Sequence, residues 1–262
     1  MLPNLGGTRS SLKSDHLLHT PDAFIRTPLP GATGVDFIVH AAPRLGAAFT
    51  WMTAEFTADS YLHEAPNGVQ RFLYVLEGEL EAEYTYKVSL DDPYAEEFEE
   101  QDTLTAGSFL YIPEDAEVPV HAKSKARAVL IEKAYQLADI DPNERNPESG
   151  NESETTPEPL GGDPDLLVRR LMPDGREWDF AVNTMTYAPG AALAQVEVHV
   201  MEHGLLMLEG SGIYRLGDHW YPVTAGDFIW MAPYCPQWFG AIGKIPAKYL
   251  IYKDWNRHPL GE

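Results

Sequence analysis

Cysteine is almost absent from this chain of 262 residues, and so are other features that mark whole classes of protein. The single cysteine, Cys235, excludes an internal disulfide. The N-terminal segment MLPNLGGTRSSLKSDHLL lacks the apolar core of a secretory signal. No apolar run is long enough to span a bilayer. The sequence therefore predicts a protein of the reducing cytoplasm with no membrane partner.

Basic residues are also scarce. The chain has 19 Lys and Arg against 40 Asp and Glu, which gives a formal net charge of -21. Such a balance argues against a phosphate-binding surface, so we expect no nucleic-acid partner and no binding to an anionic membrane. The simplest explanation of the charge is solubility.

A long amphipathic helix pattern is missing as well. The 21 Gly, 21 Pro and 13 Tyr, together with many runs of Val, Ile and Thr, favour a turn-rich β structure. The length suffices for two small domains or one large one, each with a core of its own.

What the chain does contain is an internal repeat of three blocks in the same order. Each block is a short apolar run that ends at Gly or Pro, as in strands joined by tight turns. The pairs are RFLYVLEGELEAEY (71–84) with HGLLMLEGSGIYRL (203–216), LTAGSFLYIPEDAEVPV (104–120) with VTAGDFIWMAPYCPQWF (223–239), and AVLIEK (128–133) with KYLIYK (248–253). The repeat predicts a duplicated β domain.

The segment between the two copies is acidic and rich in Pro and Gly. We expect an N-terminal domain over 1–138, a linker over 139–165 and a C-terminal domain over 166–262, because the middle segment lacks the apolar residues that a core requires. A second acidic stretch, 89–102, predicts a solvated insertion in one hairpin of the first domain.

Potential metal ligands gather in the second copy, in the pattern Glu197-x-His199-x3-His203 followed by Gln237. If the segment is extended, the period of two places its three ligands on one side. This spacing is that of the cupin metal motif. We therefore predict an all-β bicupin, with two tandem cupin barrels of the double-stranded β-helix or jelly-roll type.

The ligand set limits the choice of metal. One carboxylate, two imidazoles and one amide oxygen without thiolate disfavour structural zinc and suit Mn²⁺, Fe²⁺ or another octahedral ion. Four protein ligands leave two positions for water or a chelating substrate. The alternative is that His199 and His203 only form hydrogen bonds inside a β core, which the complete set of four makes less attractive.

The first copy lacks these ligands. Counting from the matching glycines Gly78 and Gly107, the corresponding residues are Ala65, Asn67, Arg71 and Val118. We therefore expect the first barrel to be metal-free. His63 and Glu64 lie nearby but out of register, and His121 is expected at a surface or interface.

Three further polar residues are candidates for the same cavity. Tyr249 and Lys253 share parity on the last strand of the repeat, and Tyr214 lies on a neighbouring strand. A lysine inside a barrel requires an anion, which suggests a substrate carboxylate, or a role in proton transfer. The alternative is that Lys253 faces solvent while the tyrosines pack the core. Lys133 occupies the matching place in the first copy, which weakens the functional interpretation.

Beyond the cupin motif, two stretches resemble the (S)-ureidoglycine aminohydrolase family, the bicupin enzymes of purine-ureide (allantoin) degradation. They are EVHVMEHGLLMLEGSGIYRLGDHWYPVTAGDFIWMAPYCPQWF (197–239) and YLIYKDWNRHPL (249–260). The resemblance implies one Mn²⁺ per chain held by Glu197, His199, His203 and Gln237. It also implies a substrate pocket with Glu197, Tyr214, Tyr249 and Lys253, and a homo-oligomer.

By the same resemblance, the expected reaction replaces the amine of (S)-ureidoglycine by a hydroxyl group, giving (S)-ureidoglycolate and ammonia. Two alternatives stay open. One is another metal-dependent cupin enzyme, either oxalate-degrading or a dioxygenase, although those enzymes more often use three His and one Glu. The other is a non-catalytic bicupin that binds a small ligand and would not need an open metal site.

Overall fold

The computed structural model describes residues 7–87, 96–114, 116–136, 145–173, 175 and 177–254. Parts of three expected features lie outside these residues: 89–95 of the acidic insertion, 139–144 of the linker, and 255–260 of the second resembling stretch.

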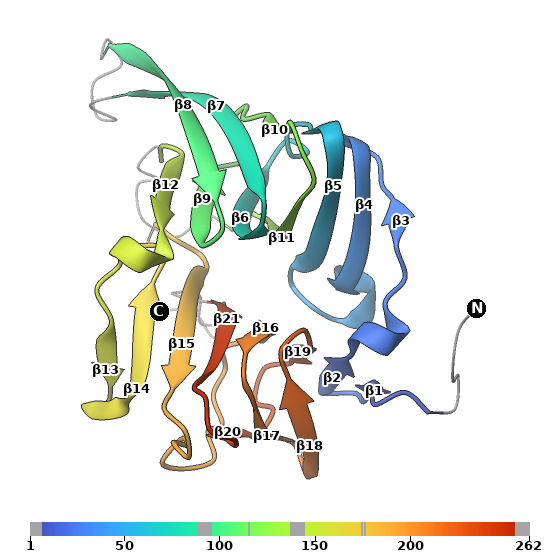
Figure 1. Ribbon diagram of the computed structural model, residues 1–262, viewed down its shortest axis with the longest axis vertical. Helices are drawn as coiled ribbons and strands as arrows, with labels where there is room; N and C mark the ends of the chain where they lie inside the picture. Colours follow the sequence, from blue (N-terminus) through green and yellow to red (C-terminus); the bar gives the residue numbers. More distant parts are fainter. Residues whose placement is uncertain are drawn as a thin grey trace. The chain divides into compact units, whose positions relative to one another are not determined.

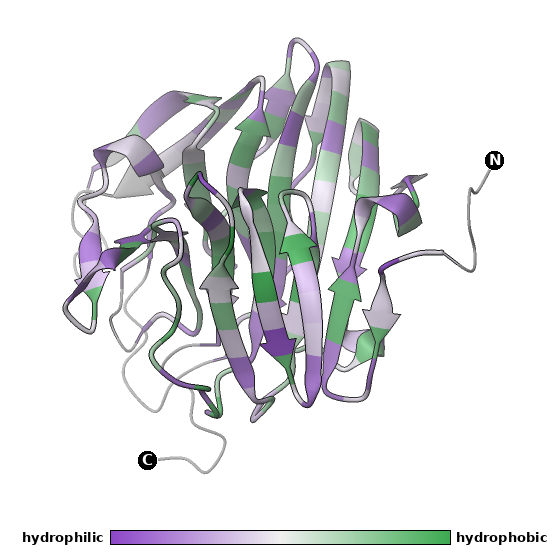
Figure 2. Cartoon of the chain, turned by 60° about the horizontal axis from the view of Figure 1, so that its bottom comes forward, coloured by the Kyte–Doolittle hydropathy of each residue, from purple (hydrophilic) through white to green (hydrophobic). Residues whose placement is uncertain are grey.

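The prediction of an all-β bicupin is confirmed: the described residues form strands, with three short 3₁₀ helices between them. Hydrophobic and hydrophilic residues alternate along many strands (Figure 2), as expected where one face of a sheet is buried. No helix in the described part of the chain is long and apolar enough to cross a membrane. The chain divides into two compact units, Ile25–Glu154, here the first barrel unit, and Met1–Phe24 with Thr155–Glu262, here the second barrel unit.

The first barrel unit is built on one ten-stranded sheet in the order β12-β9-β6-β11-β5-β10-β7-β8, with β4 on β5 and β3 on β4 (Figure 1). Its elements are β3 (Thr27–Pro28), β4 (Ala32–Ala41), a 3₁₀ helix (Pro43–Leu45), β5 (Thr50–Leu62), β6 (Val69–Glu77), β7 (Glu79–Lys87), β8 (Glu97–Thr105), β9 (Ser108–Ile112), β10 (Val120–Ala122), β11 (Ala126–Ala134), β12 (Glu148–Asn151) and a 3₁₀ helix (Glu152–Glu154).

The second barrel unit has an eight-stranded sheet, β1-β2-β19-β16-β21-β15-β14-β13, and a three-stranded sheet, β18-β17-β20. Its elements are β1 (Ser11–Leu12), β2 (His16–His19), a 3₁₀ helix (Pro21–Ala23), β13 (Glu158–Leu160), β14 (Asp163–Arg170), β15 (Ala181–Tyr187), β16 (His203–Glu209), β17 (Ser211–Leu216), β18 (His219–Thr224), β19 (Phe228–Met231), β20 (Gln237–Ala241) and β21 (Ala247–Lys253).

The strand order repeats between the units, as a duplication requires. The run β9-β6-β11-β5 of the first unit corresponds to β19-β16-β21-β15 of the second, and β8-β7-β10 corresponds to β18-β17-β20. The turn glycines also correspond. Gly78 and Gly210 have φ angles of 80° and 68°. A Cβ added to Gly78 would lie 2.5 Å from the Lys125 carbonyl oxygen, and one added to Gly210 would lie 2.3 Å from the Pro246 carbonyl oxygen. Only glycine tolerates both conditions.

The boundaries of the two units differ from the expected ones at 138 and 165, because each sheet is extended by a strand from outside its repeat. β2, from the N-terminal segment, pairs with β19, and β12, from the expected linker, pairs with β9. An uncovered sheet edge leaves backbone N–H and C=O groups unpaired, and these added strands satisfy them. The N-terminal segment therefore belongs to the second barrel unit, and the linker is divided between the two units.

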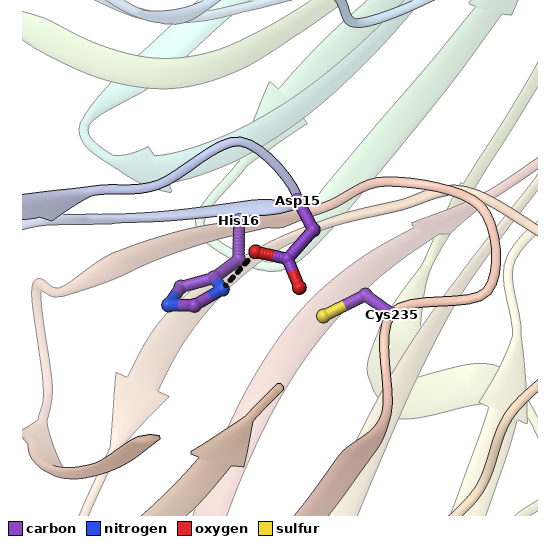
Figure 3. A group of neighbouring side chains, drawn as sticks. All are labelled: Asp15, His16 and Cys235. Atoms are coloured by element: carbon purple, nitrogen blue, oxygen red, sulfur yellow. Dashed lines mark hydrogen bonds and ion pairs between the residues drawn. The ribbon is translucent and has the colours of Figure 1, made fainter. Parts of the chain in front are cut away.

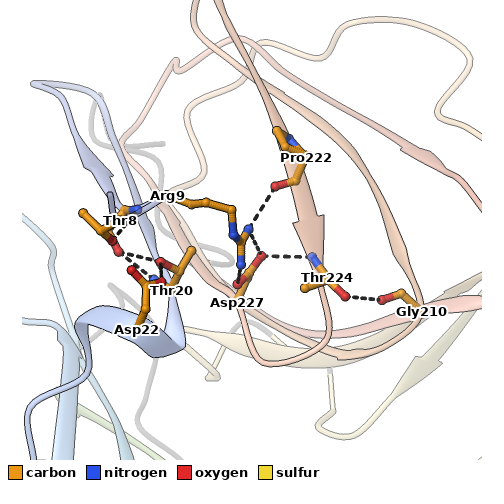
Figure 4. Close-up of polar contacts among 9 residues, drawn as sticks. Thr8, Arg9, Thr20, Asp22, Gly210, Pro222, Thr224 and Asp227 are labelled. Atoms are coloured by element: carbon orange, nitrogen blue, oxygen red, sulfur yellow. Dashed lines mark hydrogen bonds and ion pairs between the residues drawn. The ribbon is translucent and has the colours of Figure 1, made fainter. Parts of the chain in front are cut away.

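An ion pair anchors the N-terminal segment to its barrel. Arg9 donates from Nη1 and Nη2 to the two carboxylate oxygens of Asp227, at 2.8 and 2.7 Å (Figure 4). The Asp227 side chain is fully buried and also accepts from the Thr224 backbone N–H at 2.9 Å. A buried carboxylate is tolerated when it is paired in this way.

Candidate metal centre

The four expected metal ligands meet in the second barrel unit, but they are not carried by one continuous strand. His203 begins β16 and Gln237 begins β20, whereas Glu197 is joined to Gln237 by an isolated bridge. The chain between Glu197 and His203 passes from the three-stranded sheet to the eight-stranded sheet, so it leaves one hydrogen-bond ladder before entering the other. Glu197, His199 and His203 therefore do not share one strand, although their side chains converge.

His199 Nε2 lies at the centre of the group. It is 2.8 Å from Gln237 Nε2, 3.4 Å from His203 Nε2 and 3.9 Å from Glu197 Oε2. An octahedral ion with bonds of about 2.1 Å places neighbouring ligand atoms about 3 Å apart. The distances from His199 to His203 and Glu197 are close to what one divalent ion requires, whereas Gln237 turns its amide nitrogen to His199 and its oxygen to the Tyr214 hydroxyl.

Hydrogen bonding and burial leave the Nε2 lone pair of His203 available to a metal ion. The Nδ1 of His203 bonds to the Tyr252 carbonyl oxygen at 3.1 Å. Because that oxygen can only accept, Nδ1 carries the proton and Nε2 keeps its lone pair. Burial, with smaller contributions from His199 and Lys253, lowers the pKa of His203 to about 3, so the ring is neutral at neutral pH. His199 Nδ1 is buried without a hydrogen-bond partner among the described residues. The donors fit a divalent cation.

Two predicted tyrosines lie beside this group, and the structure adds a third. The Tyr214 hydroxyl donates to Gln237 Oε1 at 3.4 Å. The Tyr249 hydroxyl shares a hydrogen bond of 2.8 Å with Tyr187, which the sequence analysis missed. Burial raises the pKa of all three phenols, so they are neutral hydrogen-bonding groups. No motif marks Tyr187, because its partner lies 62 residues further along the chain.

Lys253 faces the barrel interior beside the ligands. It lies directly opposite His203 where β21 pairs with β16, so the two side chains share a face. With the Asn183 amide nitrogen donating to the Val182 carbonyl oxygen, its oxygen accepts from Lys253 Nζ at 3.0 Å. Burial lowers the pKa of the Lys253 ammonium, Glu197 opposes that shift, and Arg170 adds to it.

The corresponding row of the first barrel unit holds an ion pair. Arg71, the counterpart of His203, lies opposite Glu132, and their side chains approach to 2.6 Å. Arg71 also donates to the His63 carbonyl oxygen at 2.7 Å. Val118, the counterpart of Gln237, lies in the apolar core. A guanidinium and an apolar side chain offer no metal ligand, and the metal-free first barrel stays a prediction.

The expected match of Lys133 with Lys253 is wrong by one residue. In the second unit Ile251 lies in the core, and Lys253, two residues later, is on the same face of the strand. In the first unit the core residue is Leu130, and the residue two positions later on that face is Glu132. Lys133 is therefore buried on the opposite face, because a shift of one residue reverses the side on which a strand residue points.

A second group of potential metal ligands, absent from the sequence predictions, joins the N-terminal segment to the barrel (Figure 3). The ligand atoms of Asp15, His16 and Cys235 all lie within 4.8 Å of one another. His16 already uses both ring nitrogens, bonding to Asp15 Oδ1 and to the Tyr221 hydroxyl at 2.9 Å each. Burial raises the pKa of the Cys235 thiol to about 11, so the thiol keeps its proton. The group serves as a hydrogen-bonded clasp, and no local motif indicates it because Cys235 is distant in sequence.

Comparisons with known proteins identify the fold and the family. The family model of the cupin domain matches residues 183–252. The chain is 37% identical to an (S)-ureidoglycine aminohydrolase of Arabidopsis thaliana over 97% of this chain and 80% of the relative. Among solved structures it is similar to a putative glyoxylate-induced protein of Pseudomonas aeruginosa, with a TM-score of 0.83, 26% identity and coverage of 98% and 94% of the two chains.

A more distant structure shares only the fold. A Bacillus subtilis oxalate decarboxylase with Mn(II) centres has a TM-score of 0.65 and 12% identity, over 95% of this chain and 80% of its own.

Proposed function

This chain belongs to the (S)-ureidoglycine aminohydrolase family, and we propose that it hydrolyses (S)-ureidoglycine to (S)-ureidoglycolate and ammonia with the help of Mn²⁺. The observation that carries the proposal is the convergence of Glu197, the two imidazoles and Gln237 beside Lys253, on the inner face of one barrel.

The metal assignment rests on the chemistry of the donors. Glu197, His199, His203 and Gln237 would hold the ion, and their oxygen and nitrogen atoms suit an octahedral cation such as Mn²⁺. When bound, such an ion supplies Lewis acidity that polarises a substrate group.

The other residues of the centre bind and orient the substrate. In the reaction a water oxygen bonds to the central carbon, the carbon–amine bond breaks, and the amine leaves as ammonia after gaining a proton. Lys253 pairs with the substrate carboxylate or ureido oxygen. Tyr214 and Tyr249 are neutral at neutral pH, so their hydroxyl groups can hold the polar ends of the substrate without adding charge. Fixing the reacting carbon in one orientation sets the stereochemical outcome.

Release of ammonia from freshly generated (S)-ureidoglycine tests the proposal. We expect Mn²⁺-dependent release above the rate without enzyme, formation of (S)-ureidoglycolate, and loss of both in the variant His199→Ala. A protein that binds Mn²⁺ but leaves the rate unchanged would contradict the proposal. Parallel assays with oxalate, and with dioxygen uptake as the readout, separate the two alternative cupin activities.

The proposal extends to a cytoplasmic homo-oligomer. The second barrel unit exposes large apolar side chains, among them Val198, Trp220 and Ile245. Contact between copies would cover such residues. Sedimentation should give a mass above that of one chain, and a strictly monomeric profile would refute the oligomer.

A further inference from the structure

We propose that Tyr187 is a positioning residue of the candidate metal centre, which fixes the hydroxyl group of Tyr249 so that this group donates its proton to a bound ligand. The inference rests on the proposed function, in which Tyr249 holds a polar end of the substrate, and deepens it by naming the group that directs Tyr249. Tyr187 is the last residue of β15, and Tyr249 lies on the neighbouring strand β21.

The two phenols lie beside the candidate ligands. The ring of Phe239 packs against all three tyrosines of the centre: its centroid is 4.8 Å from that of Tyr187, 5.5 Å from that of Tyr214 and 5.7 Å from that of Tyr249. Phe239 follows Gln237 by two residues on β20, so the two side chains share one face of the strand. The Tyr214 hydroxyl itself donates to Gln237 Oε1. The pair of hydroxyl groups is therefore packed next to the ligands.

The pair has one more proton than it uses. Each phenol can donate one hydrogen bond. Tyr187 and Tyr249 share a single bond of 2.8 Å, and in the part of the chain that the structure describes neither hydroxyl forms another. Both side chains are buried, with exposed fractions of 0% and 2%. A buried donor without an acceptor is unfavourable, so the second O–H group is suited to donate to a ligand.

The strand order shows which of the two hydroxyl groups is nearer the ligands. Tyr249 is on β21, which pairs with β16, the strand that begins at His203. Tyr187 is on β15, one strand further away. When Tyr187 donates to the Tyr249 oxygen, the remaining proton is the one on Tyr249. The first bond also polarises the second and strengthens it. Without Tyr187, the Tyr249 hydroxyl can turn about its C–O bond, and its proton is no longer directed at the ligand.

The first barrel unit shows that this fold does not require the Tyr187 hydroxyl. Ala126 and Ala247 correspond, because a Cβ added to the matching turn glycine would lie 2.8 Å from the Cα atom of each. Phe56 pairs with Ala126 as Tyr187 pairs with Ala247, so Phe56 is the counterpart of Tyr187. Phe56 lies in the apolar core of its unit. A plain phenyl ring therefore fills this place in a folded barrel.

The other two tyrosines of the centre are also replaced in the first unit. Ala128 takes the place of Tyr249, and Ala82, counted from the turn glycine, takes the place of Tyr214. Both alanines lie in the apolar core. The three hydroxyl groups thus accompany the candidate ligands in one unit and are replaced together with them in the other, which favours a role in the chemistry of the site over a role in folding.

Turnover of (S)-ureidoglycine by Tyr187→Phe tests the inference, because this substitution introduces the ring that Phe56 provides in the first unit. We expect the variant to fold and to keep its metal content, while kcat/KM falls about three- to tenfold, as for the loss of one hydrogen bond. Tyr84→Phe is the matched control, since Tyr84 is a buried tyrosine of the first unit whose hydroxyl donates to Asp102 Oδ2 at 2.8 Å. The control should leave kcat/KM unchanged.

A double-mutant cycle separates positioning from a general effect on packing. If Tyr187 acts through the Tyr249 hydroxyl, the double variant Tyr187→Phe/Tyr249→Phe should have the same kcat/KM as Tyr249→Phe alone. The same cycle on the affinity for N-carbamoylglycine, measured by calorimetry, gives a readout without turnover. This molecule has the ureido and carboxylate groups of the substrate but no amine to be released.

Unchanged kcat/KM in Tyr187→Phe would overturn the inference. Equal losses from Tyr187→Phe with and without the Tyr249 hydroxyl would overturn it as well, and so would failure of Tyr187→Phe to fold, since the hydroxyl would then serve the fold. If the two substitutions are coupled in the affinity for N-carbamoylglycine but no ammonia is released from (S)-ureidoglycine, the assignment of Tyr187 stands and the proposed function fails. If ammonia is released and no coupling is found, only the assignment of Tyr187 fails.

Discussion

The two barrel units share a strand order but differ in one row of residues on their inner faces. In the first unit that row holds Arg71 and Glu132, which satisfy each other's charge at 2.6 Å. In the second unit it holds the neutral ring of His203 opposite Lys253. The same fold thus carries an internal ion pair at this place in one unit and an imidazole beside a lysine in the other, where we propose the metal centre.

Two substitutions account for the proposed restriction of the metal site to the second barrel. A guanidinium at the place of His203 repels a cation, and Val118 replaces the amide of Gln237 with an apolar group. Neither change disturbs the sheet, because both side chains fit the buried inner face. The chemistry of a barrel is therefore set by few positions, independently of its stability.

The largest expected effect is on metal content. His203→Ala should lose the bound ion and lower activity by at least about 100-fold, since changes even to residues that only support a metal ligand cost about 10–100-fold. Arg71→Met, at the same place in the first unit, should retain one Mn-type ion per chain. Elemental analysis of both purified variants measures the number of metal ions per chain.

The unaltered protein should contain one ion per chain. If it contains two, and the variant Cys235→Ser also contains two, the prediction of a metal-free first barrel is wrong. That substitution removes the thiol of the Asp15, His16 and Cys235 group, so it separates an ion at the clasp from one in the first barrel.

The next effect concerns the lysines. Lys253→Met should lower kcat/KM severely while metal content and folding stay nearly intact, because removing one partner of a desolvated charge pair costs about 2–5 kcal/mol. Lys133→Met should change turnover little, since Lys133 lies on the opposite face of its strand, in the unit that has Ala65, Asn67, Arg71 and Val118 at the places of the four candidate ligands. Steady-state kinetics with (S)-ureidoglycine measures kcat/KM of both variants. If the two substitutions lower kcat/KM equally, the assignment of the catalytic site to the second barrel is wrong.

A smaller effect is expected on the attachment of the N-terminal strand. Arg9→Ala leaves the buried Asp227 carboxylate without its guanidinium and should destabilise the second unit by about 1–3 kcal/mol. Arg26→Ala breaks a pair with Glu55 in the first unit that is largely exposed, and should cost about 0–1 kcal/mol. Hydrogen exchange should rise in β2 and β19 for the first variant only. Unchanged protection of β2 would show that the ion pair does not hold the strand.

The smallest effect is a dependence on pH. Burial lowers the pKa of His16 despite the neighbouring Asp15 carboxylate. In the unfolded chain the imidazole has a pKa of about 6.5, so the unfolded state takes up a proton first as the pH falls. Attachment of β2 should weaken below about pH 6.5 and continue to weaken down to the lowered pKa of the folded state.

Hydrogen exchange of β2 at pH 7 and pH 5, corrected for intrinsic rates, measures this change. β12, the corresponding added strand of the first unit, has the sequence ESGN without histidine and is the internal comparison. The pH effect on β2 should shrink in His16→Gln and disappear in the double variant His16→Gln/His19→Gln, because burial also lowers the pKa of His19 on the same strand. An unchanged pH effect in the double variant would contradict control by these histidines.

Local patterns in the sequence determined the all-β class, the duplication and the residues of the candidate metal centre. Strand alternation and turn glycines act over a few residues, so the blocks around Gly78 and Gly210 can be recognised without tertiary information. Counting from these glycines was enough to align His203 with Arg71, because β6 and β16 have no insertion between glycine and ligand.

Only the tertiary structure decided which distant segments pair and in which register. It assigned Glu132 instead of Lys133 to the row of Lys253, joined Tyr187 to Tyr249, and brought β2 and Arg170 to the second barrel. Backbone hydrogen bonds between strands are the same for almost every residue type, so the sequence of one strand does not determine which other strand it pairs with. Register and edge pairing follow from the packing of the whole sheet, and a shift of one residue exchanges its inner and outer faces.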